Sequence, residues 1–320
     1  LNKINRIYIV ACGTAMHAGL VGKSAIEKLC KIPTEVDIAS EFRYRDPIID
    51  DKTLCIYISQ SGETADTIAA LKLAKAKGAK TLAVSNVIGS SITREADYTI
   101  YTHAGPEIAV ASTKAYTSQV VLMVILAVYF TEVLGSCDEN YIEELKSDIL
   151  DLPAKVETIL DEINTVKEFA NKVYTEHDMY FLGRGTDYNV AMEGSLKLKE
   201  ISYIHSEAYA AGELKHGPIA LISEQTPVIA IATQSNIIGK TLSNISEVKS
   251  RGAKVVLMCS EDTVIKENVA DYIIRIPQCD ELLMPILAAV PLQLIAYYTA
   301  ILRGNDVDQP RNLAKSVTVE

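Results

Sequence analysis

Residues Thr53–Thr67 read TLCIYISQSGETADT, in which an apolar run passes directly into a cluster of hydroxyl side chains. The run Leu54–Ile58 has the length and the apolar content of a buried strand. Beyond the hydroxyl cluster, apolar residues recur at helical spacing as far as Gly78. The stretch therefore predicts a strand, a tight turn and the beginning of a helix.

The predicted turn is rich in groups that bind a small anion. The first turn of a helix has unpaired N–H groups and the positive end of the helix dipole. Ser59, Gln60, Ser61 and Thr64 add three hydroxyls and an amide around Gly62. At the carboxyl end of a parallel strand, these groups predict a phosphate site. An ordinary helix cap without a ligand is the alternative, although three hydroxyls exceed what capping requires.

The two halves of the chain repeat one another at an offset of 172 to 174 residues. Five short stretches match in the same order, which predicts a tandem duplication into two similar domains. The matched pairs are Gly13-Thr14 with Gly185-Thr186, Ser40–Phe42 with Gly212–Leu214, Ser59–Ser61 with Thr233–Ser235, Lys77–Lys80 with Arg251–Lys254, and Ala96–Tyr98 with Ala270–Tyr272.

Each half alternates short apolar strands with helical patterns, which predicts βαβ units and a parallel sheet. The fold class is therefore α/β, with two tandem doubly wound domains of three αβα layers. We expect a first domain at 1–137, a helical connector at 138–166, a second domain at 167–303 and a C-terminal tail at 304–320. The connector has one apolar stripe, and Pro153 is expected to break it into two helices. The expected strands are Ile7–Ala11, Thr34–Ile38, Leu54–Ile58, Thr81–Val84 and Tyr98–Tyr101, then Met179–Leu182, one near Ser206, Val228–Ala232, Lys254–Met258 and Tyr272–Ile276.

The duplication also predicts that only one half binds an anion. The first copy has Ser61-Gly62-Glu63-Thr64 after its third strand, whereas the second has Ser235-Asn236-Ile237-Ile238. The second copy thus lacks the glycine and two of the polar positions. We expect one anion pocket per chain, in the first half.

Composition excludes several classes of protein. The net charge of −10 and the pI near 5.1 argue against a general nucleic-acid partner. The longest apolar run, Val120–Phe130, is too short to cross a bilayer. Six scattered cysteines without a C-x-x-C pair, and no visible signal peptide, favour a reducing, cytoplasmic setting. The five histidines have no metal-ligand spacing, so we expect neither a structural metal nor a cofactor.

Three further groups of residues are candidates for chemistry. Glu193, Lys197 and Glu200 fall on one face of a predicted helix, which suggests a carboxylate base beside an ammonium or, equally, a solvated salt-bridged face. His216 precedes Gly-Pro on a predicted turn, although a lone histidine is more often structural. Lys315 lies in a polar tail that is either a frayed end or the carrier of a Schiff-base lysine.

Three stretches resemble the isomerase part of the glucosamine-6-phosphate synthase family, the glutamine–fructose-6-phosphate aminotransferases. They are SQSGETADT (59–67), KLKEISYIHSEAYAAGELKHGP (197–218) and DQPRNLAKSVTVE (308–320). The resemblance spans essentially the whole chain, through two sugar isomerase (SIS) domains and the tail. The first stretch is shared more widely among phosphosugar-binding SIS proteins, and the other two are highly specific.

The resemblance implies that the chain binds fructose 6-phosphate and gives glucosamine 6-phosphate. It implies that Lys315 forms a Schiff base with C2, Glu200 moves a proton between C1 and C2, and Lys197 assists proton transfer. His216 would open the sugar ring from the partner subunit of a homodimer. The implied substrate contacts are Ser59, Gln60, Ser61 and Thr64 for the phosphate, and Thr14, Val110, Ser112 and Ala314 for the sugar.

Two departures from the family pattern affect these expectations. Ala15 stands where family members often have serine, which removes one hydroxyl contact and weakens sugar binding by about 0.5–1.5 kcal/mol. The N-terminal glutaminase domain of the family has no counterpart here, so this chain alone is expected not to hydrolyse glutamine. A phosphosugar aldose–ketose isomerase without amination and a non-catalytic phosphosugar sensor are the alternative functions.

Overall fold

The computed structural model describes residues 1–319, so Glu320, the last residue of the expected tail, lies outside the described residues. The described chain forms two compact units. The first contains Leu1–Leu145 together with the tail from Ala314, and the second contains Lys146–Leu313. The last part of the expected tail, from Ala314, therefore belongs to the first unit, whereas residues 304–313 belong to the second.

Within residues 1–319, the first unit has a five-stranded parallel sheet in the order β2-β1-β3-β4-β5. The central strands β1 and β3 are almost completely buried, as expected for strands covered on both faces. The elements are β1 Arg6–Ala11, α1 Gly13–Cys30, β2 Thr34–Ile38, α2 Ala39–Phe42, β3 Thr53–Ser59, α3 Ala65–Ala76, β4 Lys80–Ser85, α4 Ser91–Glu95, β5 Tyr98–Tyr101 and α5 Lys114–Leu134.

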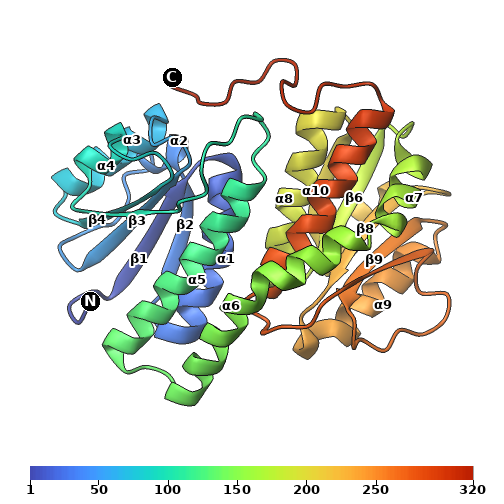
Figure 1. Cartoon of the computed structure of the whole chain (residues 1–320), viewed down its shortest axis with the longest axis horizontal. Helices are drawn as coiled ribbons and strands as arrows, with labels where there is room; N and C mark the ends of the chain where they lie inside the picture. Colours follow the sequence, from blue (N-terminus) through green and yellow to red (C-terminus); the bar gives the residue numbers. More distant parts are fainter. Residues whose placement is uncertain (320) are drawn as a thin grey trace. The chain divides into compact units, whose positions relative to one another are not determined.

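The helices of the first unit cover both faces of its sheet (Figure 1). On one face, α2, α3 and α4 bury a core around Tyr8, Phe42 and Tyr57. On the other face, α1 and α5 pack against each other, with Gly22 of α1 close to Met123 of α5. The three αβα layers predicted from the sequence are therefore present.

The second unit has the same sheet topology, in the order β7-β6-β8-β9-β10 within the described residues. The predicted duplication is confirmed, because both sheets place their strands in the same order along the chain. The elements are α7 Asn164–Val173, β6 Asp178–Gly183, α8 Thr186–Ser202, β7 His205–Ala210, η1 Glu213–His216, η2 Pro218–Leu221, β8 Pro227–Ala232, η3 Ser235–Ile237, α9 Ile238–Lys249, β9 Lys254–Ser260, β10 Tyr272–Ile276 and α10 Met284–Leu302.

Helix α6, Glu139–Asp161, continues through Pro153, so the expectation that Pro153 breaks the connector into two helices is wrong. A proline inside a helix removes one hydrogen bond and strains the preceding turn. Leu145, Leu152 and Ile159 lie on the buried stripe of α6. Burial of this stripe before and after the proline is enough to keep the helix continuous.

Among the described residues, α5 and α10 are long and apolar enough to cross a membrane by length and composition. Each packs inside its own unit, α5 against α1 and α10 against α8 and α7. Half of the most apolar window of α5 and two thirds of that of α10 are buried. Packing in the core of each unit accounts for the apolar character of the buried side chains of α5 and α10.

A repeated aspartate fixes the last strand of each sheet. Asp97 precedes β5, and its Oδ2 accepts hydrogen bonds from the backbone N–H of Thr81 at 2.9 Å and the Thr81 hydroxyl at 3.0 Å. Asp271 holds the equivalent place before β10 and accepts the N–H of Val255 at 2.7 Å. The matched tripeptides Ala96–Tyr98 and Ala270–Tyr272 thus preserve a link between neighbouring strands.

We expect Asp97→Asn to lower the free energy of unfolding by about 1–2 kcal/mol, because a charge-assisted acceptor is lost. Burial opposes ionisation of Asp97, but the bonds from Thr81 and the nearby Lys75 outweigh it and lower the pKa of the carboxyl. This stabilisation is therefore present above the unfolded-state pKa of about 3.9 and is lost as the pH falls through the folded-state pKa. Urea unfolding of wild type and of Asp97→Asn, at several pH values from neutral to acidic, measures this difference in stability. Asp161→Asn, at an exposed carboxylate, serves as the control. A difference between Asp97→Asn and wild type that does not shrink at acidic pH would contradict the assignment.

Candidate functional site

The predicted phosphate loop lies between the end of β3 and the start of α3, with its side chains turned onto its own backbone. The Ser59 hydroxyl accepts the N–H of Gly62 at 3.0 Å and lies 3.4 Å from the Thr64 hydroxyl. The Ser61 hydroxyl accepts the N–H of Glu63 at 3.2 Å. These bonds fold the five residues after β3 into a compact turn at the N-terminus of α3.

Gly62 is required by the shape of this turn. Its φ of +69° lies in the left-handed region, which residues with a side chain rarely adopt. A Cβ at this position would lie 2.1 Å from the Ser90 hydroxyl oxygen and 2.5 Å from the Ser90 Cβ. The loop is thus packed against the residue that precedes α4, and only glycine fits there.

Thr64 occupies the N-cap position of α3, but among the described residues its side chain makes no capping hydrogen bond. The hydroxyl cluster is therefore not explained as an ordinary cap. Hydroxyls at a helix N-terminus, where the dipole is positive, form a site suited to an anion.

The loop also lies at the switch point of the first sheet. In the order β2-β1-β3, the chain leaves β1 and β3 toward opposite edges of the sheet, and ligands of open α/β sheets bind in the crevice between such strands. Thr14 lies in the first turn of α1, directly after β1, and Ala15 follows it. Thr14 and the phosphate loop thus lie at the carboxyl ends of two neighbouring strands.

The segment between β5 and α5 contains a buried carboxylate that the sequence analysis did not identify. Glu107 accepts the Ser112 hydroxyl at 2.8 Å, the N–H of Thr113 at 2.8 Å and the N–H of Ala115 at 3.3 Å. It therefore fixes the strand-to-helix segment that contains Val110 and Ser112. The Ser112 hydroxyl donates a hydrogen bond to Glu107. The Ser112 oxygen can therefore still accept a hydrogen bond from a sugar hydroxyl.

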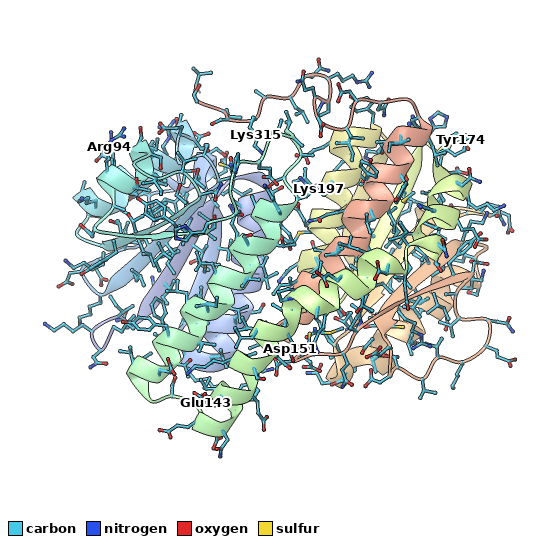
Figure 2. All side chains as sticks on the ribbon, viewed as in Figure 1. Arg94, Glu143, Asp151, Tyr174, Lys197 and Lys315 are labelled. Carbon is cyan, nitrogen blue, oxygen red and sulfur yellow. The ribbon has the colours of Figure 1, made fainter. Side chains whose placement is uncertain are left out.

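The tail is attached to the phosphate loop rather than frayed. The Ser316 and Ser61 hydroxyls share a hydrogen bond of 3.0 Å, and the carbonyl of Val317 accepts the N–H of Ala65, the first residue of α3. Lys315, which is labelled in Figure 2, directly precedes Ser316 in the chain. Ala314, on its other side, is exposed. The Lys315 Nζ donates to the carbonyl of Ala109 at 2.7 Å and to Glu107 Oε2 at 3.1 Å.

In the second unit, α8 carries a buried ion cluster (Figure 2, at Lys197). Lys197 Nζ lies 3.5 Å from Glu193 Oε1 and forms a short ion pair with Glu200. The side chains of Glu193 and Lys197 are 2% exposed and that of Glu200 is 20% exposed, so the solvated salt-bridged face considered as an alternative is wrong. Burial opposes the charge on Lys197, but the two carboxylates outweigh it and raise the pKa of its ammonium.

His216 ends the one-turn 3₁₀ helix η1 and is exposed. Gly217 follows with a φ of +135°, and Pro218 begins η2. The prediction of a turn rather than a helix at His216 is wrong in that His216 belongs to a 3₁₀ helix, although the glycine and the proline end that helix after one turn.

The second copy of the phosphate loop is closed by carboxylates of its own unit. Glu281 Oε1 accepts the N–H of Ser235 at 2.9 Å and also the Ser235 hydroxyl. Asp187 accepts the N–H of Thr233 at 2.8 Å and also the Thr233 hydroxyl. Burial raises the pKa of Asp187 to about 6. The donors that correspond to Ser59 and Ser61 thus already hold anions, which agrees with a single anion pocket in the first half.

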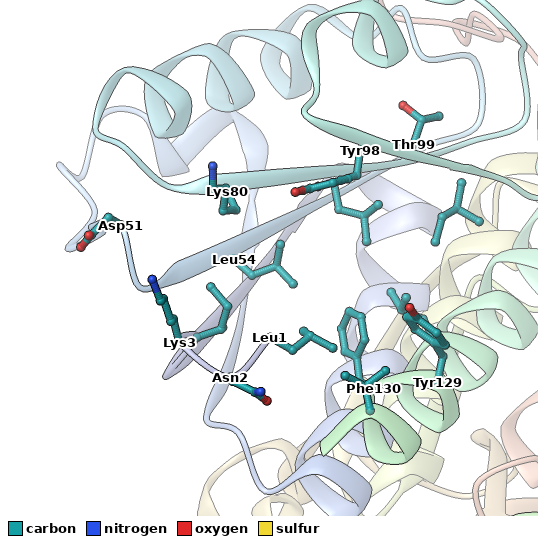
Figure 3. A pocket seen from close by; sticks show the side chains of 15 residues that line it. Leu1, Asn2, Lys3, Asp51, Leu54, Lys80, Tyr98, Thr99, Tyr129 and Phe130 are labelled. Atoms are coloured by element: carbon teal, nitrogen blue, oxygen red, sulfur yellow. The ribbon is translucent and has the colours of Figure 1, made fainter. Parts of the chain in front are cut away.

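A groove of about 800 Å³ in the first unit lies away from the phosphate loop (Figure 3). Its lining comes from the N-terminal residues, the beginnings of β3, β4 and β5, and the second half of α5, and includes Lys80, Tyr98 and Phe130. It faces the amino ends of the strands, the edge opposite to that where open parallel sheets bind ligands.

The structure brings the sequence-predicted residues together within each unit. In the first unit, Ser59, Ser61 and Thr64 form one loop, and the tail places Lys315 on the segment that contains Val110 and Ser112. In the second unit, Lys197 and Glu200 are paired. Glu107, Ser316, Asp187 and Glu281 were missed. The duplication could have pointed to Asp187, because Asp187 is the counterpart of Ala15, which directly follows the predicted sugar contact Thr14.

Comparisons with known proteins agree with this arrangement. The SIS domain family matches residues 1–129 and 172–303. A glutamine–fructose-6-phosphate aminotransferase (isomerizing) of Clostridium perfringens is 61% identical over the whole chain, which covers 53% of that protein. The chain thus spans about half the length of the curated relatives that it matches.

Two solved structures have the same fold over nearly the whole chain. The C-terminal domain of glucosamine-fructose-6-phosphate aminotransferase from Francisella tularensis is 40% identical, with a TM-score of 0.93 over 97% of this chain and 88% of that one. A glucosamine-6-phosphate deaminase from Thermotoga maritima is 25% identical, with a TM-score of 0.79 over 99% and 92%. The chain therefore belongs to the SIS domain family, as a tandem pair of SIS domains that matches the C-terminal domain of glucosamine–fructose-6-phosphate aminotransferase.

Proposed function

We propose that this chain carries out the sugar chemistry of glucosamine 6-phosphate synthesis. It binds fructose 6-phosphate, forms a Schiff base at C2, and converts the ketose to the aldose with amination at C2 by ammonia. The observation that supports this most directly is a lysine held next to an anion site, since Lys315 and the Ser61 loop are joined by the same short tail.

In this proposal the phosphate of the sugar is bound by Ser59, Gln60, Ser61 and Thr64. Thr14, Val110, Ser112 and Ala314 contact the sugar. Neutral donors at a helix N-terminus suit a dianion, because the backbone N–H groups and the helix dipole there already favour negative charge. The contact between Ser61 and Ser316 would be exchanged for a contact with the phosphate when substrate binds.

The chemistry of the sugar is assigned to charged side chains. Lys315 forms the Schiff base with C2, and Glu200 moves a proton between C1 and C2. Lys197 stays protonated beside Glu200 and assists nearby proton transfers, in keeping with its raised pKa. His216 opens the sugar ring and does so in the site of the partner subunit of a homodimer.

Several parts of the proposal concern the whole protein. The relatives named glutamine–fructose-6-phosphate aminotransferase are about twice as long as this chain, which is consistent with a glutaminase domain that supplies ammonia in the full-length protein. A cytoplasmic location and domain limits at 137, 166 and 303 remain predictions from the sequence.

The phosphate loop is tested by paired substitutions in the two copies. Ser61→Ala should weaken binding of fructose 6-phosphate roughly 10- to 100-fold, because a hydrogen bond to a charged group is worth about 1.5–3 kcal/mol. Ser235→Ala, at the equivalent position of the second loop, should leave the affinity unchanged. Isothermal titration calorimetry of both variants measures this, and equal weakening by the two would argue against a single site in the first unit.

The Schiff base is tested by reductive trapping. Borohydride added to wild type with fructose 6-phosphate should attach one sugar per chain, at Lys315, and Lys315→Ala should give no adduct. Lys72→Ala, at an exposed lysine of α3, is the control and should react as wild type does. Peptide mass spectrometry locates the adduct; an adduct on another lysine, or none in wild type, would rule out the assigned role.

Proton transfer is tested at Glu200. Glu200→Gln should slow exchange of a C1 proton of fructose 6-phosphate with deuterated solvent by about 10²-fold or more, since it removes the base. Trapping at Lys315 should persist, because the Schiff base does not need Glu200. Glu247→Gln, at a surface carboxylate paired with Lys215, is the matched control. Proton NMR of the sugar follows the exchange, and wild-type exchange in Glu200→Gln would remove Glu200 from the mechanism.

A further inference from the structure

Glu107 is a buried carboxylate that the proposed chemistry does not use. Its side chain is only 4% exposed, on the segment between β5 and α5. Oε1 accepts the N–H groups of Thr113 and Ala115, at the start of α5. Oε2 accepts the Ser112 hydroxyl and the Lys315 ammonium. Each oxygen therefore accepts two hydrogen bonds, and the carboxylate has no capacity left over.

These four bonds exceed what the start of a helix needs. Oε1 already caps α5 through the N–H groups of Thr113 and Ala115, and a carboxylate at a helix N-terminus is favoured by the dipole. Burial opposes ionisation of Glu107, but the N–H of Thr113, the Ser112 hydroxyl and Lys315 outweigh it and lower the pKa of the carboxyl. A fixed negative charge thus faces the tail lysine.

The two groups that accept hydrogen bonds from Lys315 lie outside the tail. The second acceptor, the carbonyl of Ala109, lies on the same segment as Glu107. The next two residues, Ser316 and Val317, are attached to Ser61 and Ala65 of the phosphate loop and α3. Three consecutive tail residues are therefore fixed to two separate parts of the first unit.

We propose that Glu107 is a positioning residue for the Schiff-base lysine, holding the Lys315 nitrogen and, through it, the tail against the segment before α5. This inference rests on the proposed function of Lys315. Glu107 would act through Lys315 and Ser112, with no contact of its own to the sugar.

The charge balance of the reaction suits a fixed carboxylate at this place. Lys315 ammonium and the C2 carbonyl together give a protonated imine and one water: the C–N bond forms, the C–O bond breaks, and the carbonyl oxygen leaves with two protons from the ammonium. The nitrogen carries one positive charge before and after. Glu107 can therefore remain ionised and paired with the same nitrogen on both sides of the step.

The first test separates positioning from binding. Glu107→Gln keeps the size of the side chain and removes its charge. We expect borohydride trapping with fructose 6-phosphate to slow roughly 10-fold, the scale of one charge-assisted hydrogen bond, and the dissociation constant of the sugar to change less than about 2-fold. Asp97→Asn, at another carboxylate of the same unit, which accepts the backbone N–H and the hydroxyl of Thr81, should trap at the wild-type rate. Wild-type trapping in Glu107→Gln, or a matched loss of affinity, would overturn the proposal.

A second measurement decides the matter even if Glu107→Gln does not fold. Lys315→Met removes the ammonium and leaves the bonds of Glu107 to α5 in place. Hydrogen exchange of the peptide spanning residues 312–319 should then be roughly 10-fold faster than in wild type without substrate. Unchanged exchange would show that the pair does not hold the tail and would overturn the proposal. A wild-type chain that forms no borohydride adduct would reject the proposed Schiff base, while exchange still tests the Glu107–Lys315 attachment.

Discussion

The turn that joins β3 to α3 is the feature on which the rest of the site depends. Gly62 adopts a φ that other residues avoid and packs against Ser90, which turns the hydroxyls of Ser59, Ser61 and Thr64 toward the start of α3. The same turn holds the tail through Ser61 and Ala65. The proposed anion site and the attachment of the lysine-bearing tail thus share one loop, so a change in that loop is expected to affect both.

The two copies of the domain use the same topology for different purposes. In the first unit, the donors at the carboxyl end of β3 are arranged around a loop without a carboxylate bound to Ser59 or Ser61 among the described residues. In the second unit, Asp187 and Glu281 take the equivalent donors. Buried donors must be satisfied, and a copy without a ligand satisfies them with its own side chains. This difference supports the proposal that only the first copy binds an anion.

The charged residues of α8 differ in how deeply they are buried, and this difference bears on the role of each. An exposed ion pair contributes little to stability, whereas removal of one partner from a buried pair costs about 3–5 kcal/mol. Glu193 and Lys197 belong to the buried kind, and Glu200 remains partly accessible. A group that exchanges protons with a substrate must be reachable, and a group that keeps its charge must be shielded, so this difference in exposure agrees with the separate roles proposed for Glu200 and Lys197.

The sequence by itself determined the strands, the duplication, the hydroxyl loop and the shared face of Glu193, Lys197 and Glu200. The strands, the hydroxyl loop and the shared helix face follow from apolar runs, turn residues and the helical period, which are local patterns. The duplication follows from matches between the two halves, which can be read from the order of residues without any knowledge of contacts. Only the tertiary structure decided that α6 continues through Pro153, that Glu193 and Lys197 are buried, and that Glu281 closes the second loop. The pairing of Glu107 with Lys315 joins residues 208 positions apart. No local pattern encodes such a contact, because it arises from the path of the chain and from the need of a buried carboxylate for donors.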